Sequence, residues 1–249
     1  MSVRYLYAVV TEPVPAPLGV GLGGEPLGLV RWRDLMAVTG VLRGAPALSA
    51  DALRAHDAVV RRLARRAPAL LPARFGSLVR DEPALVEWLR LRARGLREAL
   101  ALVAGGEQMT LRVYGTATAT NDEPSGGNEP AGRDEAAGGP AGGALEALGP
   151  GARYLARRLH AQRQAAAAPE IAPLRRALGR LVRAERVERH DSPPLLVSVH
   201  HLVPRGAGAR YRATLARARP GLRPLRMRAS GPWPPYAFAP SPVADEHSG

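Results

Sequence analysis

The sequence contains no cysteine and no lysine, and each absence narrows what the protein can be. Without cysteine, disulfides, thiol nucleophiles, zinc ribbons and iron–sulfur clusters are excluded. All 35 basic residues are arginine, against 22 acidic residues, so the formal net charge is +13. Because alanine, glycine and proline are also abundant, we attribute the arginine usage to GC-rich coding sequence. The charge alone is therefore weak support for nucleic-acid binding.

Long apolar runs are also missing. No stretch approaches the roughly 18 apolar residues of a membrane span. The opening residues 1–12 are too short for a secretory signal and lack a small-residue cleavage site behind them. We therefore expect a soluble, cytoplasmic protein that does not contact a membrane. At 249 residues the chain is long enough for two domains.

No catalytic or metal-binding motif is convincing. Residues 19–24 contain a formal G-x-G-x-x-G, but three prolines separate it from the first predicted strand and no helix signal follows it, so we interpret it as a loop. His200 and His201 are adjacent on a predicted strand and point to opposite faces, which predicts one core and one surface histidine. His56 lies on an apolar helical stripe and is expected in a core or an interface, not in a catalytic site. We predict no enzymatic activity, no cofactor and no bound metal ion.

Apolar patterning predicts an N-terminal α+β domain over residues 1–115. Short runs of β-branched, aromatic and other apolar residues predict strands at 3–10, 27–32, 35–41, 70–79 and 109–114, of which the last closes this domain. The strand at 70–79 contains Pro72 and Gly76 and is expected at an edge. Apolar residues at helical spacing predict two helices, capped by Ser49 and Asp81.

Residues 116–150 separate this domain from a second one. They include eight glycines and four prolines and no aromatic residue, which predicts a flexible insert or linker. Residues 151–240 are predicted to form the C-terminal α+β domain, and the polar tail 241–249 is predicted to be disordered. The predicted elements of the C-terminal domain are helices at 154–167, 171–182 and 209–218, a central strand at 195–203 and a strand at 222–229. Helices packed on one side of a small, largely antiparallel sheet, twice over, define the α+β class.

Arginines recur along the predicted helices of both domains. They are Arg90, Arg92, Arg94 and Arg97, and again Arg175, Arg176, Arg180, Arg183, Arg186 and Arg189. Such runs are usually solvated helix faces. The alternative is an electrostatic docking surface for an acidic protein partner.

Residues 230–238, with the sequence Ser-Gly-Pro-Trp-Pro-Pro-Tyr-Ala-Phe, are improbable as an ordinary loop in a chain with only 4% aromatic residues. Three prolines fix the backbone φ and remove three donors, so we predict a stiff, extended element that presents Trp233, Tyr236 and Phe238 at set positions. Two interpretations remain open. The aromatics fill the core of the C-terminal domain, or they form a contact surface for a partner.

This segment resembles the T-G-P-W-P-P-Y-S-F-like ending of the gas vesicle protein F/L family (GvpF/GvpL). Three further stretches are similar to family motifs and occur in the family's order. Residues 5–10 resemble the opening strand, residues 71–78 (LPARFGSL) resemble L-P-V-R-F-G-T-V, and residues 151–158 (GARYLARR) resemble G-R-A-Y-L-x-R-R. Only residues 116–150 fall outside the family's pattern.

The resemblance implies a non-enzymatic protein of two α+β domains, the C-terminal one of a modified ferredoxin-like type. It also implies a cytoplasmic, gas-vesicle-associated role in which the protein binds the hydrophobic main shell protein and other accessory proteins during assembly. The candidate interaction or family-motif residues are Arg74, Phe75, Gly76, Tyr154, Gly231, Pro232, Trp233, Pro234, Pro235, Tyr236 and Phe238. The alternative from a different class is a basic nucleic-acid-binding or regulatory protein, whose binding would weaken steeply with salt.

Overall fold

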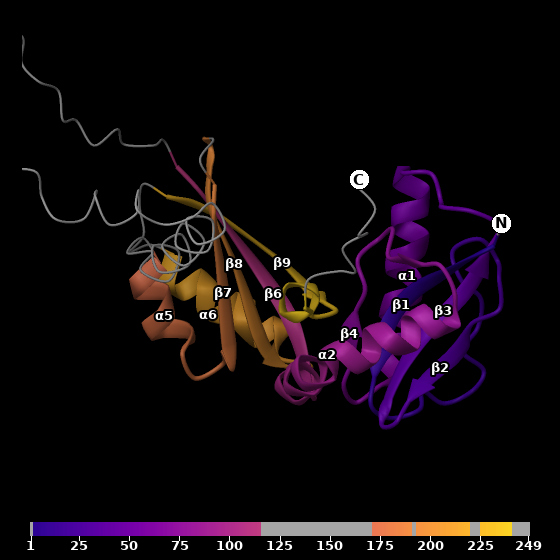
Figure 1. The fold of residues 1–249 in the computed structure, drawn as a ribbon. Coiled ribbons are helices and arrows are strands. Elements are labelled where there is room, and N and C mark those ends of the chain that lie inside the picture. Colours follow the sequence, from indigo (N-terminus) through magenta and orange to yellow (C-terminus); the bar gives the residue numbers. More distant parts are fainter. Residues whose placement is uncertain (1, 116–170, 191–192, 220–224, 241–249) are drawn as a thin grey trace, which may run out of the picture.

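The computed structural model describes residues 2–115, 171–190, 193–219 and 225–240. Over these residues the chain forms two antiparallel sheets with helices against them (Figure 1). The predicted insert at 116–150, the predicted helix at 154–167 and the predicted tail lie outside the described residues. They therefore stay predictions.

The first sheet has the order β2-β3-β1-β4, and β5 also pairs with β1. Its strands are β1 (Val3–Val10), β2 (Gly28–Trp32), β3 (Leu35–Leu42), β4 (Leu71–Pro72) and β5 (Leu78–Val79). The strands predicted at 27–32 and 35–41 are confirmed as β2 and β3, which pair as an antiparallel hairpin. The predicted edge strand at 70–79 is divided into β4 and β5 by a turn in which Gly76 has φ +82.

Two helices cover opposite faces of this sheet. α1 (Ala50–Arg66) begins at Ser49 and α2 (Glu82–Val103) begins at Asp81, and each cap side chain accepts a backbone N–H as predicted. α1 packs on the face that carries Tyr5 and Tyr7, and α2 packs on the face that carries Leu6. The expectation that helices lie on one side is therefore wrong for this sheet. Because β1 is apolar on both faces, both faces require cover.

The second sheet has the order β7-β8-β6-β9, all antiparallel. Its strands are β6 (Gly106–Tyr114), β7 (Ala184–Arg189), β8 (Leu195–Pro204) and β9 (Arg226–Trp233). α5 (Ala172–Leu178) and α6 (Gly208–Ala218) pack on one face of it. The central position predicted for the strand at 195–203 is confirmed. The strand order and the two helices are compatible with a ferredoxin-like βαββαβ arrangement.

β6 lies in the second sheet, not in the first as its position in the sequence suggested. α2 runs across one face of the first sheet to the start of β6, which then lies between β8 and β9 (Figure 1). Alternation of apolar residues predicts a strand but not its partners, and this strand's nearest sequence neighbours belong to the other sheet. The domain limits stay a prediction, and the pairing of β6 argues for placing the first limit before Gly106.

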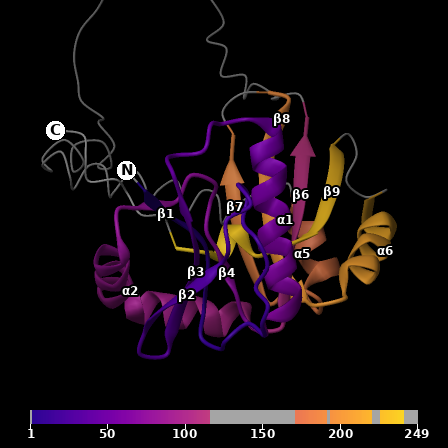
Figure 2. The same cartoon turned by 90° about the vertical axis from the view of Figure 1, so that its right-hand side faces the viewer.

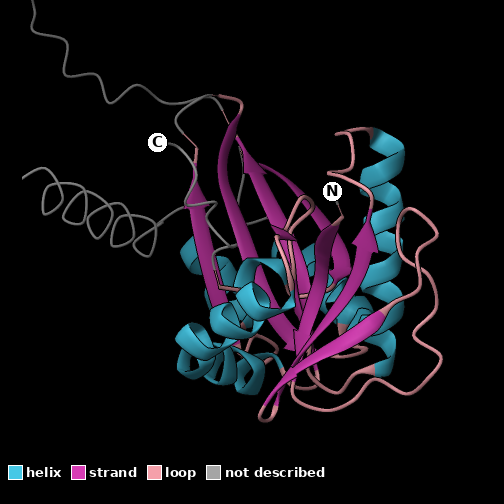
Figure 3. Ribbon diagram, turned by 45° about the vertical axis from the view of Figure 1, so that its right-hand side comes forward, coloured by secondary structure: helices cyan, strands magenta, loops and turns pink. Residues whose placement is uncertain are grey.

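β7 corrects a second expectation, because Arg186 and Arg189 lie on a strand and not on a helix. The sequence of β7 is AERVER, which lacks the apolar alternation of a half-buried strand. β7 is an edge strand that pairs only with β8 among the described strands. Charged side chains are common at sheet edges because they oppose pairing with other chains. The two sheets fill the middle of the molecule, with helices on the outside (Figure 3).

Candidate functional site

Residues 230–238, here called the proline-aromatic segment, connect the second sheet to the first. The segment begins in β9, where Ser230 and Trp233 pair with Thr110 and Gln108 of β6. It then leaves the sheet and forms a short 3-10 turn, η3 (Tyr236–Phe238), beside β4. The Gln108 side-chain oxygen accepts the N–H of Ala237 at 2.8 Å. The predicted extended element is thus a strand end followed by one anchored turn.

Phe238 holds this segment in a core that both sheets share. Its side chain is 1% exposed and belongs to a cluster with α2 and with Leu6 of β1, which Leu202 of β8 also joins. The Arg186 guanidinium lies 5.8 Å from the ring centroid. Phe238 is therefore not confined to the core of the second sheet, and its depth excludes it from direct contact with a partner in this conformation.

Trp233 and Tyr236 are only partly buried. The Arg61 guanidinium of α1 stacks over the Trp233 ring at 4.3 Å from its centroid, and the indole N–H donates to Ser230 Oγ at 3.3 Å. The Arg61 Nε also donates to Asp57 at 2.6 Å, which holds the stack in place. Burial raises the pKa of the Tyr236 hydroxyl, which keeps it protonated. In Figure 2, α1 stands in front of the second sheet.

The four remaining motif residues of the segment determine the path of its backbone. They are Gly231, Pro232, Pro234 and Pro235. Pro234 and Pro235 are buried, whereas Pro232 is exposed. Gly231 has φ +119, and a Cβ there would lie 2.7 Å from the carbonyl oxygen of Gln108. A glycine is therefore required where the segment leaves Ser230.

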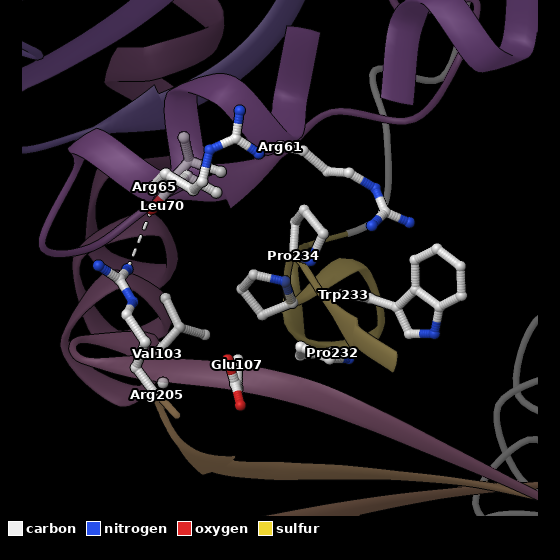
Figure 4. A pocket seen from close by; sticks show the side chains of 12 residues that line it. Arg61, Arg65, Leu70, Val103, Glu107, Arg205, Pro232, Trp233 and Pro234 are labelled. Carbon is white, nitrogen blue, oxygen red and sulfur yellow. Dashed lines mark hydrogen bonds between the residues drawn. The ribbon is translucent and has the colours of Figure 1, made fainter. Parts of the chain in front are cut away.

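The segment forms one wall of a groove of about 420 Å³ (Figure 4). The other walls come from α1, the end of α2, the start of β6 and the residue after β8. Its lining residues are Arg61, Ala64, Arg65, Leu70, Val103, Gly106, Glu107, Arg205, Pro232, Trp233, Pro234 and Pro235. Three guanidinium groups thus surround a mostly apolar surface.

Two polar side chains of the groove lining, Arg205 and Glu107, differ in their hydrogen bonding. The Arg205 guanidinium donates to the carbonyl oxygens of Ala64 and Ala67, at 3.1 and 3.0 Å, and so connects the end of β8 to the end of α1. Glu107 Oε1 is buried and accepts no hydrogen bond from any described residue. A buried acceptor without a donor is costly to the folded state.

Arg74, Phe75 and Gly76 lie in the turn between β4 and β5. The Gly76 N–H donates to the Tyr5 hydroxyl at 3.0 Å, and Phe75 packs edge-on against Tyr5 and His56. His56 bonds the Tyr5 hydroxyl and the Ala73 carbonyl, at 3.0 and 3.1 Å, and burial lowers the pKa of its imidazole. The expected core position of His56 is confirmed.

This turn lies close to the end of the proline-aromatic segment. Exposed Arg74 lines a small cavity together with Ala239 and Pro240. Two motifs about 160 positions apart in sequence therefore meet at β4. The remaining motif residue, Tyr154, lies outside the described residues.

The structure adds groove residues that sequence motifs did not indicate: Arg61, Arg65, Glu107 and Arg205. They come from α1, β6 and the end of β8, and only the fold places them together. The arginines of the predicted helix faces are mostly surface residues, and several are ion-paired, as Arg90 is with Glu87. The groove arginines differ in position, because they gather around one apolar hollow instead of spreading over a solvated helix face.

The histidine pair and the glycine-rich stretch behave as expected. His201 is buried between Tyr211 and Glu185, at 2.7 and 2.9 Å, whereas His200 is partly exposed on the opposite face of the sheet. Residues 19–24 form a loop. Over the described ranges there is no group of three or more metal-ligating side chains. Within the same ranges, no helix combines the length and apolar character needed to cross a membrane.

Comparison with known proteins gives one consistent result. The family model described as gas vesicle synthesis protein GvpL/GvpF matches residues 3–240. Gas vesicle protein L of Streptomyces sp. (strain CB03234) is 31% identical, with 98% of this chain and 95% of that protein covered. Crystal structures of the gas vesicle protein GvpF from Anabaena sp. PCC7120 and from Microcystis aeruginosa are similar, each with a TM-score of 0.67 and 16% identity. They cover 99% and 96% of this chain, and 100% and 99% of their own chains, and show a shared fold.

Proposed function

The chain belongs to the GvpL/GvpF family of gas vesicle synthesis proteins, and we propose that it binds the hydrophobic main shell protein and other accessory proteins during gas vesicle assembly. It does so in the cytoplasm, at the growing vesicle, without catalysing a reaction. The observation that carries the proposal is the groove beside Trp233, which is apolar inside and bordered by Arg61, Arg65 and Arg205.

The chemistry of the groove suits a segment with an apolar face. A shell protein with large apolar surfaces aggregates unless these surfaces are covered before they meet one another. Trp233 and the prolines beside it supply rigid apolar contact, which loses little conformational entropy on binding. The border arginines favour a segment with carboxylates beside its apolar face.

The test is co-expression of the full chain with the main gas vesicle shell protein, followed by affinity capture at about 0.15 M and about 0.5 M salt. We expect soluble shell protein to be captured at both salt concentrations, because apolar contact is not screened. We expect Trp233→Ala to weaken binding by about thirtyfold, since truncation of a central tryptophan typically costs about 2 kcal/mol.

Trp32→Ala is the matched control, because Trp32 is also partly buried and stacked with arginine, on β2 and away from the groove. Equal capture by Trp233→Ala and wild type, with both proteins folded, would contradict direct contact at the groove. Loss of capture only at the higher salt would indicate that the arginines, and not the apolar surface, make the contact. Absence of capture at both salt concentrations would refute shell-protein binding and favour the nucleic-acid alternative.

A further inference from the structure

A second surface lies on the face of the second sheet opposite α5 and α6. On β6, Met109 and Leu111 pack toward these helices, so the residues that alternate with them, including Arg112, point the other way. The residues of β8 and β9 that pair with these alternate residues of β6 lie on the same face, away from the helices. A hollow of about 520 Å³ opens here, lined by Gln108, Thr110, Arg112, His200, Arg228, Ser230, Trp233 and Tyr236.

The floor of this hollow is already hydrogen-bonded. Thr110 Oγ1 and His200 Nδ1 are 3.1 Å apart, and the Gln108 amide nitrogen donates to Thr110 Oγ1 at 3.0 Å. The oxygen of the same amide accepts from Ala237. The floor is therefore fixed, and its polar groups do not need a ligand.

The two arginines above the floor are different. Arg112 and Arg228 are directly opposite each other on β6 and β9, and both are exposed. Like charges at directly opposed positions of a sheet destabilise it. No carboxylate of the described residues pairs with either guanidinium, whereas Arg94 of α2 is paired with Glu98. Arg226, two residues before Arg228, is exposed on the same strand and adds to the positive charge.

We propose that Arg112 and Arg228 form a docking site for an acidic segment of a partner protein. Two adjacent guanidinium groups can each bind a carboxylate through two parallel N–H donors. Trp233 and Tyr236, at the end of the hollow, add apolar contact for the neighbouring residues of such a segment. Binding offsets the repulsion between the two arginines, which folding alone leaves in place.

An acidic peptide fits this surface better than a nucleic acid. Nucleic-acid grooves combine a row of cations along the backbone path with aromatic rings on which bases stack. In the hollow, the aromatic side chains are Trp233 and Tyr236 at one end, and the floor residues that separate them from the two arginines are polar. The cations are concentrated on two neighbouring strands.

The test measures binding of the full chain to fluorescein-labelled oligoglutamate of about ten residues, with oligoglutamine and single-stranded DNA as comparison probes, by anisotropy at low salt. The variant is Arg112→Gln with Arg228→Gln. Its control is Arg90→Gln with Arg94→Gln, which removes the same charge from the ion-paired surface of α2. We expect the first variant to bind oligoglutamate at least tenfold more weakly and the control to change affinity less than twofold.

Thermal unfolding adds an independent readout. We expect the Arg112→Gln, Arg228→Gln variant to melt no lower than wild type, because it removes an opposed pair of like charges. Equal weakening in both variants would assign binding to net charge and overturn the proposal. A DNA affinity higher than the oligoglutamate affinity, lost with Arg112 and Arg228, would overturn it in favour of nucleic acid. No difference between oligoglutamate and oligoglutamine would overturn it as well.

Discussion

Gly231 is the residue on which the path of the proline-aromatic segment depends most directly. Its φ of +119 is a conformation that side chains rarely adopt, and such strain costs about 1–3 kcal/mol. A Cβ would also approach the Gln108 carbonyl oxygen to 2.7 Å and Met109 Sδ to 3.0 Å. We expect Gly231→Ala to lower the free energy of unfolding in urea by more than the backbone cost alone.

Gly206→Ala separates the two causes. Gly206 has φ +84, but a Cβ there meets no atom within 4 Å. Its substitution therefore reports strain without a clash. If Gly231→Ala is no more destabilising than Gly206→Ala, the strands relax around the added methyl group, and the proposed steric requirement is wrong.

At the scale of elements, the sequence predicted what local chemistry determines. The caps Ser49 and Asp81 placed the starts of α1 and α2, because a capping side chain acts on backbone groups three residues away. β7 was missed because an edge strand need not alternate, and its charges resemble a helix surface. β6 was assigned to the wrong sheet because strand pairing joins residues about 90 positions apart, which a local pattern does not report.

The candidate site was likewise predicted from the sequence only where local sequence determines it. Rigid prolines and a tryptophan were visible in the sequence, and so was their unusual density. The cationic border was not, because Arg61 and Arg205 occur in ordinary arginine-rich surroundings, and only the fold brings α1 and the end of β8 to the proline-aromatic segment. The depth of Phe238 was also not predictable, since its neighbours come from both sheets.

His56 of α1, which packs against the turn between β4 and β5, gives an element-scale prediction about pH. Burial holds the pKa of His56 below its ordinary value of 6.5. The unfolded chain therefore binds a proton before the folded chain does, and stability falls as pH decreases from 6.5 toward the folded pKa. We expect His56→Gln to reduce this pH dependence, measured as urea midpoints at pH of about 7.5, 6.5 and 5.5.

A separate His200→Gln variant controls for the second histidine, whose pKa burial also lowers. Carboxylates contribute mostly at lower pH, since Arg97 lowers the pKa of Asp34 to about 2. An unchanged pH dependence in His56→Gln would show that His56 does not titrate in this window. The buried contact with Tyr5 would then act through packing alone.

At the scale of the whole molecule, the groove exists only while the two sheets keep their relative position. Three contacts hold this position: the apolar cluster around Phe238, the bond from Gln108 to the segment, and Arg205 at the end of α1. The guanidinium of Arg205 lies at a helix C-terminus, where a cation is favoured by the helix dipole and by the free carbonyl groups.

Arg205→Ala is expected to weaken the contact between the end of β8 and the end of α1 without unfolding either sheet. Two charge-assisted bonds on a partly exposed side chain stabilise by about 1 kcal/mol after screening. Amide hydrogen exchange should therefore accelerate in the last turn of α1 and in the proline-aromatic segment, and stay unchanged in β1 and β3. Arg180→Ala, at an exposed arginine for which the structure shows no partner among the described residues, is the control. Unchanged exchange in Arg205→Ala would mean that the apolar cluster alone fixes the sheets, and that the groove keeps its shape without the arginine.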